Sequence, residues 1–231
     1  MKLFFGEILN DKVIIDSDEQ HHISKVLRMK EGEELYVTDG KGNVAKGNLV
    51  LEGKKVELDI LEIQTKTPSF SSYLHIAIAP TKNIDRIEFF VEKATEMGIS
   101  EISFLLTEKS ERKHLNIDKI QKKVIAASKQ SLRYHFPKVN DLQKFTSFMQ
   151  TQTAENTFVA HCDKAFKRVS LSEIPLVDKV CFLIGPEGDF SLSEIELLLE
   201  KDVQAVSLGN QRLRTETAGV FVAAWNYHKM L

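Results

Sequence analysis

The chain has 231 residues, of which 42% are hydrophobic and 28% are charged, and its formal net charge is −2. This length supports a hydrophobic core without disulfides or structural metals, and the charge excludes both a uniformly basic nucleic-acid coat and a highly charged disordered tail. Cys162 and Cys181 lack the spacing of a zinc or redox motif, so we expect free thiols in a reducing cytoplasm and no metal. No apolar stretch is long enough to cross a membrane, and Glu7 interrupts the apolar start of the chain, so we expect neither a membrane partner nor a signal peptide.

Residues 1–67 carry the pattern of a small β-rich module. The turn sequences Asp39-Gly40 and Lys41-Gly42 interrupt short runs of β-forming residues. Strands are predicted at Val13–Ile15, Glu34–Thr38, Val44–Val50 and Val56–Ile63. One helix is predicted between the first two strands, because Ser17 begins a capping-box spacing and an apolar stripe follows it. Together these elements predict a module of the barrel type.

The pattern changes after the polar, proline-containing segment Thr65–Ser69, where we place a domain boundary. Residues 70–231 alternate between strands and helices. Strands are predicted at Tyr73–Ala79, Ile99–Leu106, Thr157–Cys162, Val180–Ile184 and Val203–Leu208. Helices are predicted at Ile84–Ala94, from Asn116 onward, at Leu192–Glu200 and at Thr217–Lys229. This alternation predicts an α/β domain with a mostly parallel sheet.

A glycine-containing loop, residues 185–191, follows the entirely apolar strand predicted at Val180–Ile184. Ser191 and Glu194 then have capping-box spacing and open the next helix. Glycines let backbone amides approach a ligand, and the carboxyl ends of parallel strands are where open α/β sheets bind ligands. The spacing is neither GxGxxG nor a P-loop, which disfavours a dinucleotide or a triphosphate. A tight turn without a ligand is the alternative interpretation.

A second such loop begins at Leu208-Gly209 and leads into the last helix. Arg214 and Glu216 flank Thr215 at the start of that helix, and charges that become buried there must be paired or functional. The alternative is a surface loop with an ordinary Arg–Glu pair.

A third feature is a basic stretch between residues 109 and 138. Nine basic residues are opposed only by Glu111 and Asp118, which gives this stretch a net formal charge of +7. The basic residues are Lys109, Arg112, Lys113, Lys119, Lys122, Lys123, Lys129, Arg133 and Lys138. Such clustering is typical of phosphate-binding surfaces, and a solvated helix face is the alternative.

The loop sequences resemble those of a known family. Leu183–Gly188 with Phe190-Ser191, Leu208-Gly209 and Leu213–Ala218 are similar to the signature loops of the RsmE family. These SPOUT-class methyltransferases modify N3 of a uridine in the decoding region of bacterial 16S rRNA. The segments His21–Arg28, Glu92–Gly98 and Gln130–Pro137 also resemble family motifs, so the similarity covers essentially the whole chain.

The resemblance implies a fold and a cofactor. The expected fold is a C-terminal SPOUT domain at residues 70–231, with a trefoil-knotted, mostly parallel sheet and flanking helices, preceded by a PUA-like β-barrel at residues 1–67 that binds RNA. The expected partners are S-adenosylmethionine, 16S rRNA within assembled small subunits and a second copy in a cytoplasmic homodimer. The cofactor contacts carried over are His161, Ile184, Gly185, Gly188, Leu208, Gly209 and Leu213.

Methyl transfer to N3 requires loss of a weakly acidic proton. Arg214 is the first candidate to stabilise the resulting anion, Glu216 or Glu187 is the candidate base, and Asp189 is a third choice of base. Glu216 has the alternative role of a helix-dipole partner in the first turn. The candidate RNA contacts are Lys25, Arg28, Arg112, Lys122, Lys123 and Arg133.

The chain departs from the family pattern at two places. Asp189 stands where a second glycine is usual, and Gln211-Arg212 stands where Arg-Ile is usual. Two other functions remain open: a SPOUT methyltransferase with a different rRNA or tRNA target, and a non-catalytic RNA-binding protein that retains the fold.

Overall fold

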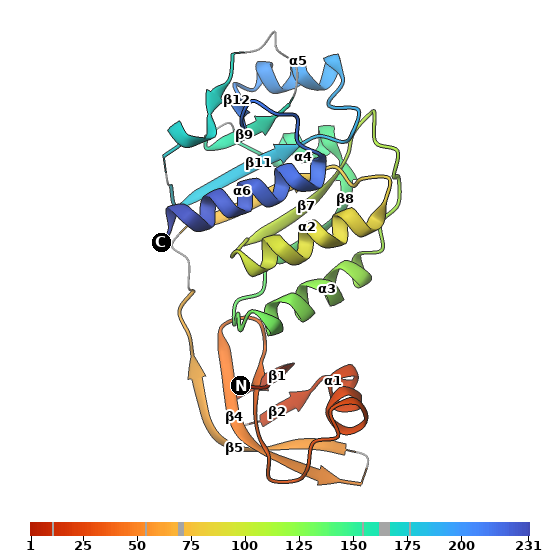
Figure 1. The fold of residues 1–231 in the computed structure, drawn as a ribbon, viewed down its shortest axis with the longest axis vertical. Helices are drawn as coiled ribbons and strands as arrows, with labels where there is room; N and C mark the ends of the chain where they lie inside the picture. The colour runs from red at the N-terminus through yellow and green to blue at the C-terminus, as the bar shows by residue number, and fades with distance from the viewer. Residues whose placement is uncertain (11, 54, 69–71, 154, 162–166, 176) are drawn as a thin grey trace. The chain divides into compact units, whose positions relative to one another are not determined.

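The computed structural model describes residues 1–231 except 11, 54, 69–71, 154, 162–166 and 176. The chain forms two compact units (Figure 1). The first unit comprises Met1–Ser69 and Ile125–Phe136, and the second comprises Phe70–Val124 and Pro137–Leu231.

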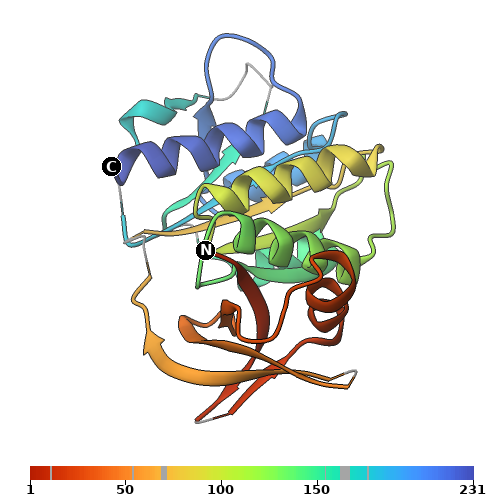
Figure 2. The ribbon, with the colours of Figure 1, turned by 60° about the horizontal axis from the view of Figure 1, so that its bottom comes forward.

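The first unit is a five-stranded sheet that nearly closes on itself. Its strands run in the order β2-β1-β3-β4-β5, and the edge strands β2 and β5 approach each other (Figure 2). The strands are β1 Leu3–Leu9, β2 Lys12–Ile15, β3 Glu34–Thr38, β4 Asn43–Glu52 and β5 Lys55–Thr65. Phe4, Leu35, Val37 and Leu49 lie in its buried core. The barrel-like module is therefore confirmed, although β1 was not predicted, because its run of apolar residues contains Gly6 and lacks a clear alternation.

The helical segment of this unit begins differently from the prediction. Asp16, not Ser17, caps helix α1 (Ser17–His21), because its side chain accepts a hydrogen bond from the Asp18 amide at 2.9 Å. The Gln20 side chain links two strands instead. It donates to the Ile15 carbonyl in β2 and accepts from the Val56 amide in β5. The helix then continues as the π-helical turn η1 (His22–Val26).

The first unit also includes a segment that is distant in sequence. Gly42 donates to the carbonyl of Tyr134 at 2.9 Å, and Phe136 donates to that of Gly40 at 2.8 Å. The rings of Phe5 and Phe136 lie 5.6 Å apart. Residues 125–136 consequently pack with the barrel, so the first unit is not the single contiguous segment 1–67 that composition suggested.

The second unit is an entirely parallel seven-stranded sheet. Its strand order is β10-β12-β9-β11-β6-β7-β8. The strands are β6 Tyr73–Ile78, β7 Glu101–Leu106, β8 Lys138–Lys144, β9 Thr157–Ala160, β10 Val169–Ser170, β11 Lys179–Ile184 and β12 Gln204–Ser207. The predicted parallel α/β fold is confirmed. The edge strands β8 and β10 were missed, because one is largely polar and the other has two residues. The trefoil knot stays a prediction.

Helices cover both faces of this sheet. The helices are α2 Ile84–Glu96, α3 Ile117–Gln130, α4 Phe145–Thr151, α5 Leu192–Glu200 and α6 Thr215–Lys229. In Figures 1 and 2, α2 and α6 lie side by side on one face of the sheet. Phe182 of β11 points to that face and meets Trp225 of α6, whereas Leu183 belongs to the opposite core with Phe145 and Phe148 of α4. The side-chain alternation along β11 therefore feeds two separate cores.

The helix ends that position the loops follow the sequence signals. The predicted capping box at Ser191 and Glu194 is present, with both reciprocal hydrogen bonds. Gly98 has φ +90° directly after α2, as expected for a glycine that ends a helix. The Asn116 side chain accepts from the Lys119 amide at 3.0 Å and starts α3. Cys162, the end of one predicted strand, lies outside the described residues, and Cys181 is a buried free thiol.

Candidate functional site

A cavity of about 370 Å³ opens at the carboxyl ends of three adjacent strands, β12, β9 and β11. Residues at or next to their carboxyl ends, Val206, His161 and Ile184, all line it. This is the edge at which open parallel sheets bind ligands. The two glycine-containing loops, which follow β11 and β12, form much of the wall.

Most of the predicted cofactor and catalytic residues meet in this cavity. Those that line it are His161, Ile184, Gly185, Glu187, Leu208, Gly209, Leu213 and Arg214. Gly188 and Glu216 are not among the lining residues. Arg86 and Arg168 line the cavity although the sequence analysis did not select them.

The first loop turns sharply at Asp189. The Asp189 amide donates to the carbonyl of Pro186 at 2.9 Å, and the Asp189 carboxylate accepts from the Phe190 amide at 2.9 Å. Asp189 has φ +60°, a left-handed conformation that glycine adopts freely and aspartate tolerates better than most residues. This explains why a glycine position in the resembled family can hold aspartate in this chain.

Gly188 is not among the residues that line the cavity, and its predicted cofactor contact stays a prediction. A Cβ atom at Gly188 would lie 3.3 Å from the Cβ and Cδ atoms of Lys109. The Lys109 ammonium donates to the carbonyl of Phe190 at 3.0 Å. The small residue at 188 thus leaves room for a lysine stem that crosses the loop.

The second loop is tied to the first. Thr215 donates from its hydroxyl to the Gly185 carbonyl at 3.0 Å, and Arg212 donates from Nη2 to the Glu187 carbonyl at 3.4 Å. Gly209 has φ +126°, and apart from its two chain neighbours no described residue has a heavy atom within 4 Å of the position a Cβ would take. Only glycine adopts this conformation readily, and it leaves open space beside the backbone.

Four arginines surround the cavity, namely Arg86, Arg168, Arg212 and Arg214. Arg168 donates to the carbonyl of His161 at 3.2 Å. The exposed Arg214 guanidinium forms no hydrogen bond or ion pair with any residue that the structure describes. Arg214 is therefore a cation at the rim that is available to a ligand.

The two candidate bases differ in position. Glu187 lines the cavity, and its Oε1 accepts from the Lys82 amide at 3.1 Å. Glu216 is buried, with 7% of its surface exposed, and its Oε1 lies 3.8 Å from Nε of Arg86. Glu216 is not among the residues that line the cavity, and its carboxylate pairs with Arg86 instead.

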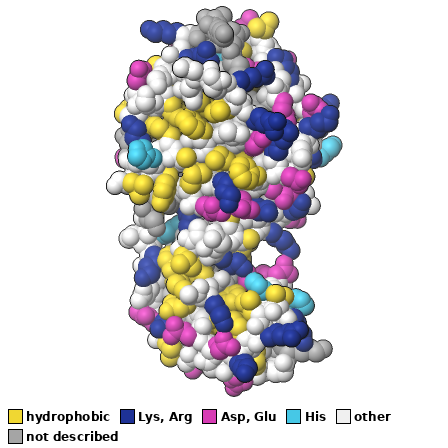
Figure 3. Space-filling view, viewed as in Figure 1, with side chains coloured by type: hydrophobic (Ala, Val, Ile, Leu, Met, Phe, Trp, Pro, Cys, Tyr) yellow, Lys and Arg dark blue, Asp and Glu magenta, His cyan; other side chains and the backbone are white. Residues whose placement is uncertain are grey.

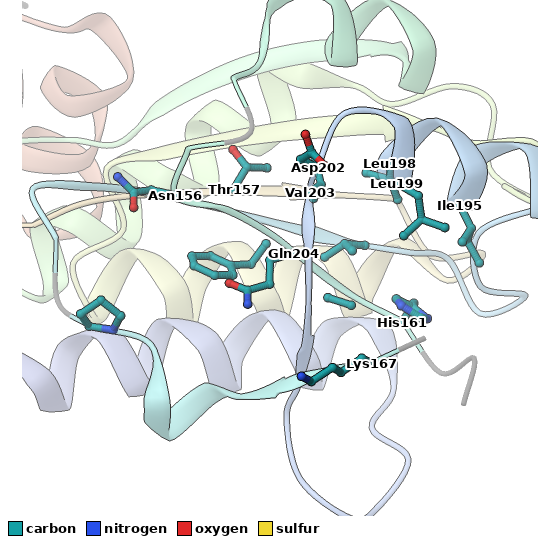
Figure 4. Close-up of a pocket in the computed structure, with 14 residues that line it drawn as sticks. Asn156, Thr157, His161, Lys167, Ile195, Leu198, Leu199, Asp202, Val203 and Gln204 are labelled. Carbon is teal, nitrogen blue, oxygen red and sulfur yellow. The ribbon is translucent and has the colours of Figure 1, made fainter. Parts of the chain in front are cut away.

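A second cavity of about 650 Å³ lies beside the first (Figure 4). His161 lines both cavities. The second cavity has apolar walls from α5, including Ile195, Leu198 and Leu199, and a polar edge at Asn156 and Gln204. Of the predicted cofactor and catalytic residues, His161 alone lines this second cavity within the described part of the chain.

The candidate RNA contacts fall into two groups. Lys25 and Arg28 are exposed neighbours at the end of η1 in the first unit. Lys122 is exposed on α3 and also interacts with another part of the protein. The other three are engaged within the protein. Arg112 donates to the carbonyls of Thr81 and Lys82 at 3.0 and 2.5 Å.

Lys123 and Arg133 are the remaining members of the engaged group. Lys123 lies within 3.8 Å of carboxylates of Glu88 and Glu92 on α2. Burial lowers the pKa of Arg133 to about 10. The sequence count of the basic stretch therefore overstated its free positive charge, because carboxylates from a different helix neutralise part of it.

No helix within the described residues is long and apolar enough to span a membrane. The same residues contain no group of three or more His, Cys, Asp or Glu side chains that could hold a metal ion.

The chain is similar to known RNA methyltransferases along nearly its whole length. The family model of the RNA methyltransferase domain matches residues 68–226, and that of the RNA methyltransferase PUA domain matches residues 15–61. The ribosomal RNA small subunit methyltransferase E of Bacillus subtilis is 28% identical over an alignment 244 positions long. The alignment covers 96% of this chain and 94% of the relative.

Two solved structures share the fold. A probable rRNA-methyltransferase from Porphyromonas gingivalis has a TM-score of 0.91 and 32% identity, covering 100% of this chain and 98% of that one. A ribosomal RNA small subunit methyltransferase E from Neisseria gonorrhoeae, bound to S-adenosyl methionine, has a TM-score of 0.85 and 27% identity, covering 97% and 95%.

Proposed function

Because the chain belongs to the RNA methyltransferase family, as its loop motifs predicted, we propose that it is an S-adenosylmethionine-dependent enzyme that methylates 16S rRNA. The proposed position is N3 of a uridine in the decoding region, modified in the cytoplasm on assembled small subunits. The proposal rests chiefly on the cavity at three strand ends, where both motif loops and an unpaired arginine converge. We further propose residues 70–231 as the catalytic domain and residues 1–67 as the RNA-binding domain.

The residues of the cavity fit S-adenosylmethionine. Gly209 leaves open space beside its backbone, and the hydrogen bond from Thr215 to Gly185 holds the two loops together. Ile184 and Leu213 add apolar surface. When bound, the cofactor supplies a methyl group on a positively charged sulfur.

The protein's own residues would remove the N3 proton of the substrate and stabilise the anion that forms. Uridine N3 must lose a proton before or during transfer, and Glu187 is the candidate base that lines the cavity, together with a second carboxylate, Asp189. The anion left on the uracil oxygens would be stabilised by the Arg214 guanidinium, which is exposed at the rim. Holding donor and acceptor in line at contact distance supplies the rest of the catalysis.

The function is tested by mapping methyl groups on rRNA from cells that lack the protein, and by restoring them in vitro. Purified protein is expected to methylate small subunits from these cells at one uridine. Equal or better methylation of naked rRNA or tRNA would favour the other SPOUT target class. Failure to bind the methyl donor would favour the non-catalytic RNA-binding protein.

Replacing Gly209 by alanine is expected to weaken methyl-donor binding at least about tenfold, or about 1.4 kcal/mol. Alanine cannot keep φ +126° without strain, so the loop backbone must move away from the ligand. Calorimetric titration with S-adenosylmethionine measures the effect. The matched control is Gly32→Ala, which also places alanine at a positive φ, +82°, but in the first unit. Equal donor affinity in both variants would contradict the proposed cradle.

Lys25 and Arg28 carry the clearest case for RNA contact in the first unit. Replacing both by alanine is expected to flatten the slope of log affinity against log salt by about 1 to 2, because each phosphate contact contributes roughly 0.9. Small-subunit binding measured across a salt series tests this. Donor affinity serves as the control and should stay constant, and an unchanged slope would remove these residues from the interface.

We also propose that the enzyme is a homodimer that pairs through α6 and α2. Figure 3 shows hydrophobic side chains gathered over these helices. Phe89 and Phe221 are 49% and 45% exposed, and Trp225 Nε1 is buried without a hydrogen-bond partner among the described residues. Such a face on a soluble chain typically packs against a partner. Sedimentation equilibrium should give twice the 26.3 kDa chain mass, and a monomer at micromolar concentration would refute the proposal.

A further inference from the structure

Arg86 occupies a fixed place at one side of the cavity. It lies in the first turn of α2, which begins directly after β6, and it lines the cavity. Asn83 caps this helix by accepting from the Asp85 amide at 2.9 Å. A capped first turn on a helix packed against the sheet holds its side chains in defined directions.

Arg86 pairs with a buried carboxylate. Its Nε lies 3.8 Å from Oε1 of Glu216, in the first turn of α6. Glu216 is 7% exposed and does not line the cavity, and its Oε2 has no hydrogen-bond partner among the described residues. A buried carboxylate is costly unless a cation stands beside it. Arg86 therefore supplies the cation beside Glu216 and also lines the cavity.

The terminal amino groups of Arg86 are left for other contacts. Within the described part of the chain, the ion pair through Nε is the one polar side-chain contact that Arg86 makes. Two terminal amino groups, Nη1 and Nη2, therefore carry donors without protein acceptors. A guanidinium in this state is suited to bind an oxygen atom of a ligand in a forked geometry.

The residues around Arg86 indicate which ligand it meets. The proposed cofactor contacts come from the loops after β11 and β12 and from the end of β9. In the sheet, β9 and β12 lie on one side of β11, and β6 lies on the other side. Arg86 follows β6 and pairs with Glu216, two residues after Arg214, so it borders the cavity on the side where Arg214 is proposed to meet the uridine. The ligand on this side is expected to be the anionic RNA.

We propose that Arg86 is a further substrate-contacting residue, whose guanidinium binds a phosphate or uracil oxygen of the target RNA, and that Glu216 positions Arg86. This inference rests on the proposed function. It gives Glu216 a role other than that of a base and leaves Glu187 as the first candidate base among the carboxylates that line the cavity.

The test uses four variants of the full chain: Arg86→Gln, Arg86→Lys, Glu216→Gln and the double variant Arg86→Gln with Glu216→Gln. Lys93→Gln is the matched control, because it removes one positive charge from the same helix at a residue paired with Glu96. For each protein, the measurements are donor affinity, small-subunit affinity, single-turnover rate at saturating subunits and the melting temperature.

Arg86→Gln is expected to lower the rate divided by the subunit dissociation constant at least about tenfold, with donor affinity changed by less than about twofold. Loss in subunit affinity would identify a phosphate contact, and loss in the saturated rate would identify a uracil contact. Arg86→Lys should recover part of the effect, because it keeps the charge but not the fork. The double variant should match Arg86→Gln within about twofold, because Glu216 acts through Arg86.

Three results would overturn the inference. The first is unchanged methyl transfer and subunit affinity in Arg86→Gln. The second is a larger loss in Glu216→Gln than in Arg86→Gln, which would make Glu216 the base. The third is loss confined to donor affinity, which would place Arg86 on the cofactor.

Unfolding of a variant and failure of the proposed function can each be distinguished from failure of the Arg86 proposal. If Arg86→Gln unfolds, Arg86→Lys and the double variant, which leave no unpaired buried charge, still report the contact. If the wild-type chain does not transfer methyl groups, the proposed function fails. Subunit affinity alone then tests Arg86, which is supported by weaker binding in Arg86→Gln and refuted by equal binding.

Discussion

Replacing Arg214 by alanine is expected to lower the single-turnover rate of methyl transfer by about two or more orders of magnitude, the scale of losing one oxyanion donor. Arg214 lines the cavity, is exposed at its rim and forms no side-chain bond with the residues that the structure describes. If its charge stabilises the uridine anion, its effect belongs to the transition state, and donor affinity should change much less. The lysine variant should recover part of the rate, because it retains the charge without the planar fork.

The measurement is transfer of labelled methyl to small subunits that lack the modification, at saturating donor and enzyme. Arg212→Ala is the informative comparison, because Arg212 lies in the same loop but is tethered to the Glu187 carbonyl. A near wild-type rate in Arg214→Ala, with a large loss in Arg212→Ala, would move the anion-stabilising role to Arg212. Loss of donor binding or unfolding in Arg214→Ala would make Arg214 a structural residue instead.

The second large expected effect concerns stability against pH, and it arises from a polar network buried between β6 and β7. His75 is 4% exposed, and its Nε2 lies 2.8 Å from the Ser103 hydroxyl. Its Nδ1 lies 3.9 Å from Glu101. Burial lowers the pKa of His75 to about 4, and the nearby Glu101 carboxylate offsets only part of that effect.

Glu101 titrates at the acid end of the same network. Burial by itself would raise the pKa of Glu101. The hydrogen bond from Asn140, the charge of His75 and the hydrogen bonds from Tyr73 and Lys138 together outweigh burial and lower the pKa to about 2. The contacts that favour the ionised carboxylate therefore persist well below neutral pH.

Acidification is expected to destabilise the fold first through His75. Its folded pKa of about 4 lies below the ordinary value of 6.5, so the unfolded chain takes up a proton first as the pH falls between these values. The free energy of unfolding should fall by about 1.4 kcal/mol per pH unit in this window, or about 3 kcal/mol in all. Glu101 adds a further loss as the pH falls from 4.5 toward about 2.

Urea unfolding between pH 7 and pH 4 measures this loss, and the His75→Gln variant is its control. The variant can still hydrogen-bond to Ser103 but does not titrate, so its stability should depend less on pH by about the histidine contribution. Parallel pH profiles for the two proteins would contradict the argument. The Ser103–His75–Glu101 arrangement resembles a hydrolytic triad, but Ser103 is fully buried and has no access to a substrate.

Local sequence patterns predicted the elements that build the cavity. The apolar run of β11 was recognised because a strand buried on both faces carries no polar residue, and β11 lies inside the sheet. The Ser191–Glu194 capping box and the two glycine-containing loops were recognised because each depends on residues a few positions apart. These features identified most of the cavity-lining residues before any fold was known.

Sequence patterns were less informative where an element takes its character from its neighbours. β8 has a largely polar sequence and is a strand because it pairs with β7. Lys123 belongs to a basic run, yet Glu88 and Glu92 on another helix neutralise it. Gly188 was grouped with the cavity glycines, but the turn at Asp189 directs it toward Lys109.

By itself, the sequence determined the α/β class, the barrel-like module and the two loops, because these follow from short-range periodicity and spacing. It determined the family through the resemblance of its motifs. The tertiary structure alone decided that Arg86 and Arg168 join the cavity, since the strand order brings together residues about 80 positions apart in the chain. It also decided that Glu216 lies behind Arg86. Burial and charge pairing depend on which helices share a face of the sheet, and no local pattern carries that information.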